Sequence, residues 1–104
     1  MSTNELIDRM KAALRTVHGN RLKGIVLYGS EARGQARSDS DIDVLVLLED
    51  MADYGKDLRA NIDALYDLSL ELGRRISPKP VAAREYEELD CPLYRRAHEE
   101  GIAA

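Results

Sequence analysis

The stretch that decides the fold runs from residue 24 to residue 48 and reads GIVLYGSEARGQARSDSDIDVLVLL. Two apolar runs, residues 24–28 and 44–48, enclose Gly29-Ser30, a ten-residue gap and the acid pair of Asp41 and Asp43. Each run has the composition and length of a buried strand. We therefore expect a strand, a tight small-residue turn, a short helical connection and a second strand. Because the runs are almost unbroken, both strands should be central and covered on both faces.

The two acids at the start of the second strand are candidate metal ligands. Side chains alternate along a strand, so Asp41 and Asp43 should point to one face and Ile42 to the other. Such carboxylates, roughly 6 to 7 Å apart along the strand, suit a hard cation such as Mg²⁺ or Mn²⁺. A simple polar turn explains Asp39 but not Asp43, which lies inside an apolar run where an unpaired carboxylate is costly. We predict a metal site at Asp41 and Asp43.

The turn that precedes the acids is a candidate phosphate site. Gly29 and Ser30 offer backbone N–H groups and a hydroxyl to phosphate oxygens. Arg33 is within reach of the same site, although it also fits a surface position on a short helix. The segment starts like a P-loop, but Gln35 and Ala36 stand where a P-loop needs Lys and Ser or Thr. A phosphate cradle beside two metal-binding acids is what group transfer from a nucleoside triphosphate requires, so ATP or another NTP is the expected ligand.

The rest of the chain adds helices and one more strand to this centre. The segments we expect are a capped N-terminal helix ending at Gly19, a long helix from Asp53 or Asp57 to Gly73, a strand over Ile76–Ala83, a helical turn over Arg84–Leu89 and a terminal helix over Pro92–Glu100. Pro78 and Pro80 place the third strand at a sheet edge or make it irregular. This order predicts an α/β fold in one domain, residues 1–104.

Composition narrows the function classes. The chain has 104 residues and a net charge of −4, which argues against direct nucleic-acid binding because nonspecific binders present a basic face. No apolar run approaches the length of a membrane span, so we expect no membrane association. Cys91 is the single cysteine, which excludes an internal disulfide and favours an intracellular, cytoplasmic location.

With these residues in hand, the chain resembles the minimal nucleotidyltransferases of the DNA polymerase β-like superfamily, including the MntA-like antitoxins of HEPN/MNT modules. Their signature of Gly-Ser, ten residues and Asp-x-Asp is present here as Gly29-Ser30 and Asp41-Ile42-Asp43. The segment Ala32-Arg33-Gly34 and the tail from Pro92 to Ile102 also look like the family.

The resemblance implies a small mixed sheet flanked by helices and transfer of a nucleoside monophosphate, usually AMP from ATP, to an acceptor hydroxyl. It implies catalytic and metal roles for Asp41 and Asp43 and nucleotide binding by Gly29, Ser30 and Arg33. Many such proteins are antitoxins that adenylylate a helical HEPN-type toxin, so a toxin of that type is the implied partner.

One departure from the family keeps two functional classes open. Active relatives commonly carry a third carboxylate on the strand after the long helix, where this chain offers Ser77 and Lys79. Asp67, Glu71 or Glu85 are the candidates to replace it. If one of them reaches the acid pair, the chain is a metal-dependent adenylyltransferase. If none does, it is a degenerate nucleotide-binding or protein-binding module that neutralises its partner by contact.

Overall fold

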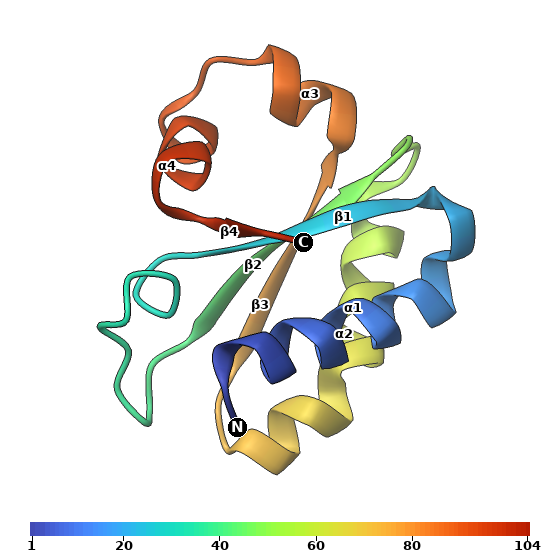
Figure 1. Cartoon of the computed structure of the whole chain (residues 1–104). Helices are drawn as coiled ribbons and strands as arrows, with labels where there is room; N and C mark the ends of the chain where they lie inside the picture. Colours follow the sequence, from blue (N-terminus) through green and yellow to red (C-terminus); the bar gives the residue numbers. More distant parts are fainter.

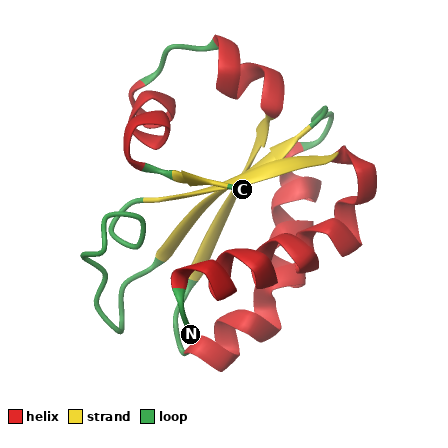
Figure 2. Ribbon diagram, in the orientation of Figure 1, coloured by secondary structure: helices red, strands yellow, loops and turns green.

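A computed structural model describes all residues, 1–104, as a four-stranded sheet with helices on both faces (Figures 1 and 2). The elements in chain order are α1 (Thr3–His18), the 3₁₀ turn η1 (Gly19–Arg21), β1 (Leu22–Tyr28), β2 (Ile42–Leu48), α2 (Tyr54–Leu72), β3 (Ile76–Ala82), α3 (Ala83–Glu88), α4 (Pro92–Glu100) and β4 (Ile102–Ala103). None of the helices combines the length and the apolar character needed to cross a membrane. The expected α/β class is confirmed.

The sheet is mixed, in the strand order β3-β2-β1-β4. β1 pairs antiparallel with β2 and with β4, whereas β2 pairs parallel with β3. β1 and β2 are therefore the central strands, as their unbroken apolar runs predict. β4 was not predicted, because two residues are too few to show a periodic pattern.

Both long helices begin at capped residues. The Ser2 hydroxyl accepts a hydrogen bond from the Glu5 amide at 3.1 Å, and the Asp53 carboxylate accepts one from the Lys56 amide at 3.1 Å. These caps satisfy amides that the first turn of a helix leaves free. The predicted capping box of α1 is confirmed. Of the two predicted start points of α2, Asp53 and Asp57, the structure has Asp53 as the cap.

The third strand lies at the edge of the sheet, as its prolines predict, and it is regular over its whole length. The Ile42 amide donates to the Arg75 carbonyl at 2.8 Å, which shows that the odd-numbered residues of this segment turn their polar groups toward β2. Pro78 and Pro80 have the opposite parity, so their backbone nitrogens point away from β2 and their missing N–H groups cost no ladder bond.

The segment between β1 and β2 contains no α-helix, so the predicted short helical connection is wrong. Residues 29–34 form consecutive turns instead, closed by hydrogen bonds from the Arg33 amide to the Gly29 carbonyl (3.2 Å) and from the Gln35 amide to the Ser30 carbonyl (2.9 Å). Gly34, in the left-handed region at φ +69°, ends this turn before a second helical turn can form.

The two faces of the sheet carry separate cores. The face toward α1 and α2 holds the larger cluster, with Met10, Leu14, Leu27, Val44 and Leu65 among its buried residues. The face toward α3 and α4 holds a small one, built from Val26, Leu45, Val81, Tyr86 and Ala97. Because side chains alternate along β2, Asp43 shares the face of Leu45, so the acid pair opens on the thinly covered side.

Candidate active site

Asp43 lies in the middle of the sheet, near the end where β1 finishes and β2 starts. It pairs with Tyr28 on β1 and with Ser77 on β3. Burial, and then the charge of Asp41, raise the pKa of the Asp43 carboxyl above its ordinary value of 3.8. None of the ion pairs in the chain includes Asp41 or Asp43. Two unpaired, mutually repelling carboxylates of this kind are stabilised by a divalent cation.

Gly29 is the residue that lets the Gly29-Ser30 turn approach Asp43. It follows β1 directly and adopts φ +75°, a conformation that favours glycine. A Cβ at this position would stand 2.8 Å from Asp43 Oδ2, closer than real Cβ contacts. The backbone of the Gly-Ser turn is therefore packed directly against the Asp43 carboxylate, so the turn predicted to bind phosphate lies beside the acid predicted to bind a metal.

A cavity of about 520 Å³ joins this turn to the terminal helix. Its walls bring together Gly29, Ser30, Arg33 and Asp43, four of the five residues predicted from the sequence. Asp41 is not among the lining residues, although it is close enough to raise the pKa of Asp43. The remaining walls come from Tyr28 and from α4, through Pro92, Leu93, Arg96 and Glu100.

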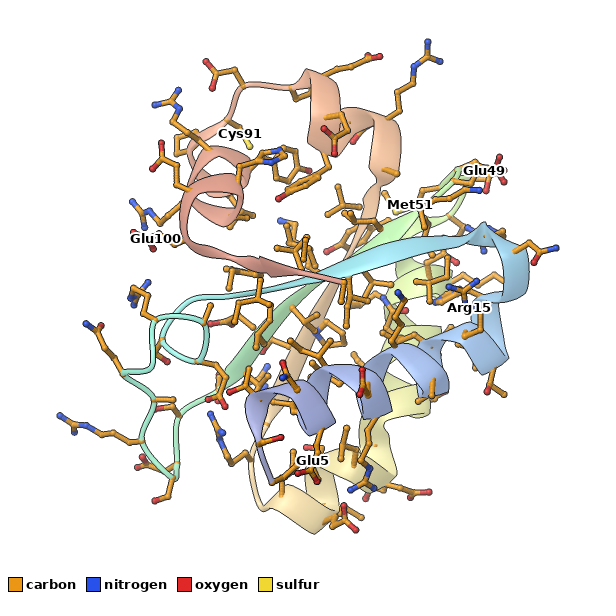
Figure 3. The ribbon with its side chains drawn as sticks, in the orientation of Figure 1. Glu5, Arg15, Glu49, Met51, Cys91 and Glu100 are labelled. Carbon is orange, nitrogen blue, oxygen red and sulfur yellow. The ribbon has the colours of Figure 1, made fainter.

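None of the four α4 residues that line the cavity was predicted as a site residue, and two of them carry charge. Arg96 takes part in no ion pair, so its guanidinium is available to an anion. Glu100 lies at the end of α4, on the side of the 29–41 segment, in Figure 3 and accepts a hydrogen bond from Arg33 Nη1 at 3.3 Å. The only signal in the sequence was the likeness of the tail to the family ending, which gives no contact.

Arg74, two residues after the end of α2, contacts the segment between the turn and the acids. Its guanidinium contacts the Glu31 carboxylate at 2.7 Å and donates to the Ser40 carbonyl at 2.9 Å. Arg74 and Glu31 are both largely buried, so this pair is shielded from solvent. One side chain thus holds both ends of the segment, and it sets where Ser30 and Asp41 stand relative to each other.

No third carboxylate completes the acid pair. Ser77 pairs with Asp43 and Lys79 with Leu45, so the register places a hydroxyl at the position next to the acid. Glu71 forms an ion pair with Arg9 of α1, on the other side of the sheet. No group of three His, Cys, Asp or Glu side chains in the chain is arranged to hold a metal ion, so neither Asp67 nor Glu85 forms such a group with the acid pair.

Comparison with known proteins now supplies the family. Residues 7–103 match the nucleotidyltransferase domain family over almost the whole chain. The chain belongs to this family. A solved structure named "Structure of putative minimal nucleotidyltransferase" is 29% identical, with 98% of this chain and 95% of that chain covered and a TM-score of 0.58. Nucleotidyltransferase membership therefore rests on sequence and on fold.

Two curated relatives come from Methanocaldococcus jannaschii. The "Putative protein adenylyltransferase MJ0141" is 37% identical over 51 residues, 49% of this chain and 52% of the relative. The "Putative protein adenylyltransferase MJ0604" is 38% identical over 58 residues, 56% of this chain and 58% of the relative. The matched part thus covers about half the length of each relative.

A crystal structure of a toxin–antitoxin with AMP-PNP has the same fold as this nucleotidyltransferase domain. It superposes with a TM-score of 0.68 over 92% of this chain and 69% of that chain, at 22% identity. An identity this low supports the fold alone.

Proposed function

We propose that residues 1–104 form a single nucleotidyltransferase domain that binds ATP with Mg²⁺ or Mn²⁺ and transfers AMP to a hydroxyl on a partner protein. The observation that carries this proposal is the packing of the Gly29 turn against the unpaired Asp43 carboxylate, inside a cavity that also holds Ser30 and Arg33. Hydrogen-bond donors for phosphate and an acid suited to a metal ion lie side by side there.

The residues present fit a divalent cation. The Asp43 carboxyl has a raised pKa because burial and Asp41 both oppose its ionisation, and no ion pair relieves that cost. When bound at Asp41 and Asp43, the cation neutralises charge on the phosphates and on the acid pair. Ser30 and the turn amides hold the terminal phosphates, and Arg33 and Arg96 balance their charge across the cavity.

The proposed transfer needs no reactants other than ATP and the acceptor hydroxyl. The acceptor oxygen bonds to the α-phosphorus, and the bond from that phosphorus to the α–β bridging oxygen breaks. Pyrophosphate leaves with the electron pair, and the hydroxyl proton passes to water, because Ser77 replaces the carboxylate that would serve as a base beside Asp43.

The proposed partner is a helical HEPN-type toxin, so the chain acts as an antitoxin in the cytoplasm. Support comes from the shared fold with toxin–antitoxin structures and from two relatives whose names are those of protein adenylyltransferases. A HEPN-type reading frame beside the gene would identify the partner.

Ser77 favours a second candidate function. A serine beside Asp43 binds a second cation weakly, so the domain could hold a nucleotide and its partner without efficient turnover. Incubation of the chain and the HEPN-type protein with ATP labelled at the α-phosphate separates the two functions. A covalent label on the partner that is absent with γ-labelled ATP supports AMP transfer, whereas a stable complex without label supports the contact-only module.

A further inference from the structure

A second cavity, of about 560 Å³, lies between α2 and the outer edge of β3. On the helix side it is lined by residues at four-residue spacing, Tyr54, Leu58, Ile62 and Tyr66. Tyr54, Ile62 and Tyr66 are 46%, 47% and 57% exposed, so three large side chains on one side of α2 are open to solvent. We call this cavity the α2–β3 groove.

The edge of β3 cannot hold a partner by strand pairing. The backbone nitrogens of Pro78 and Pro80 carry no N–H group, and the Pro78 carbonyl already accepts a hydrogen bond from Asn61 Nδ2 at 3.4 Å. An occupant of the groove must therefore be held by its side chains. Tyrosines and aliphatic residues on the walls suit an apolar or aromatic side chain.

We call the cavity lined by Gly29, Ser30 and Arg33 the phosphate cavity, after its proposed ligand. The groove and this cavity meet at a single residue, Tyr28, which lines both. The groove also contains Ser77, the sheet neighbour of Asp43. In phosphoryl-type transfer the attacking and leaving oxygens lie roughly in line. In the proposed reaction pyrophosphate would leave toward Gly29 and Ser30, on the β1 side of Asp43. The acceptor would then enter from the β3 side, where Ser77 lines the groove.

Charge indicates what kind of segment the groove accepts. Arg75 and Lys79 line it, both are exposed, and neither takes part in an ion pair. Two free cations beside an apolar wall complement an acidic segment that carries an aromatic side chain.

We propose that the α2–β3 groove is the acceptor site and that it binds a segment of the partner protein in which a tyrosine is flanked by acidic residues. This inference rests on the proposed transfer reaction. The tyrosine ring lies against Ile62 and Tyr66, its hydroxyl reaches Ser77, and the acidic neighbours pair with Lys79 and Arg75.

The test is a nuclear magnetic resonance titration of the ¹⁵N-labelled chain, without nucleotide, with the acetylated peptide Glu-Glu-Leu-Tyr-Glu-Glu. Shifts should cluster on Ile62, Tyr66, Ser77 and Lys79, and the same peptide with Lys in place of Glu should not produce them. Lys79→Glu should lower the affinity for the peptide roughly three- to tenfold. The matched control, Arg59→Glu, makes the same charge change on an exposed α2 residue outside the groove and should leave the affinity unchanged.

Three results would overturn the proposal. The peptide could produce no shifts at millimolar concentration or shifts away from the groove. Adenosine could shift the groove residues instead, which would make the groove a nucleoside site. Sedimentation equilibrium could show a dimer that Ile62→Asp dissociates, which would make the occupant a second copy. Because no nucleotide is present, peptide binding is measured independently of AMP transfer, so a chain that binds the peptide but never labels a partner refutes the proposed function alone.

Discussion

The two faces of the sheet divide stability from chemistry. The face toward α1 and α2 holds a core cluster of 14 buried residues, whereas the face toward α3 and α4 holds a cluster of 5. The second face is the one that carries Asp43, and its helix α4 forms a cavity wall there instead of filling the space. A small sheet protein can therefore leave one face open for a ligand because the other face supplies most of the buried apolar area.

The largest effect on stability should come from a substitution on the face toward α1 and α2. Leu14 is fully buried in α1, so Leu14→Ala should lower the free energy of unfolding by about 2 to 5 kcal/mol. Leu93→Ala, at a half-buried wall residue of the phosphate cavity, should cost less than this. Urea unfolding measures both values. If Leu14→Ala also altered the Mg²⁺·ATP affinity of the folded protein, the two faces would be coupled rather than separate.

Two glycines test the packing of the turn against the acid. Gly29→Ala and Gly34→Ala should each lower the free energy of unfolding by about 1 to 2 kcal/mol, because both glycines adopt a left-handed φ. Only at Gly29 does the added Cβ meet Asp43, since nothing lies within 4 Å of one at Gly34. Gly29→Ala should therefore lower the affinity for Mg²⁺·ATP roughly tenfold or more. Equal affinities for the two variants in calorimetry would show that the Gly29–Asp43 approach has no role in binding.

A smaller effect is expected in the opposite direction at Glu100. This carboxylate accepts a hydrogen bond from Arg33 and adds negative charge to the cavity in which we propose that the triphosphate binds. Exposed pairs of this kind contribute about 0.2 to 1 kcal/mol, so Glu100→Gln should tighten ATP binding by up to roughly fivefold. Glu99→Gln removes the same charge from the neighbouring position outside the cavity and should change little. An equal gain from both variants would indicate net charge as the cause rather than release of Arg33.

The smallest effect concerns pH. A raised pKa of Asp43 means that the fold favours the neutral carboxyl, so this group stabilises most below 3.8 and that contribution is lost as pH rises through the raised pKa. Asp43→Asn should flatten the Tm profile over that window and raise Tm modestly at pH 7, while Mg²⁺·ATP stabilisation disappears. A lower Tm at pH 7 would mean that the carboxylate has a structural partner in the protein.

The parts of the site that could be predicted are those that lie close together along the chain. Gly29, Ser30, Asp41 and Asp43 belong to one strand–turn–strand unit, so spacing and side-chain alternation were enough to place them. Arg96 and Glu100 lie more than fifty residues later in the chain, on α4, and no local pattern reports their contact with the same cavity.

The register of the edge strand was the other limit. Prolines predicted that β3 lies at an edge, but either Ser77 or Lys79 could have stood beside Asp43 until the parallel pairing selected Ser77. The missing helix between β1 and β2 has a local origin instead, because Gly34 adopts a left-handed φ of +69° and ends the turn.

The central claim is that the acid pair and the Gly-Ser turn bind a nucleotide through a metal ion. Calorimetric titration with α,β-methylene ATP, which cannot transfer AMP, tests it with and without Mg²⁺. We predict Mg²⁺-dependent binding that Asp41→Asn combined with Asp43→Asn abolishes and that the neighbouring Asp39→Asn preserves. Binding that needs no metal and survives the double substitution would contradict the account.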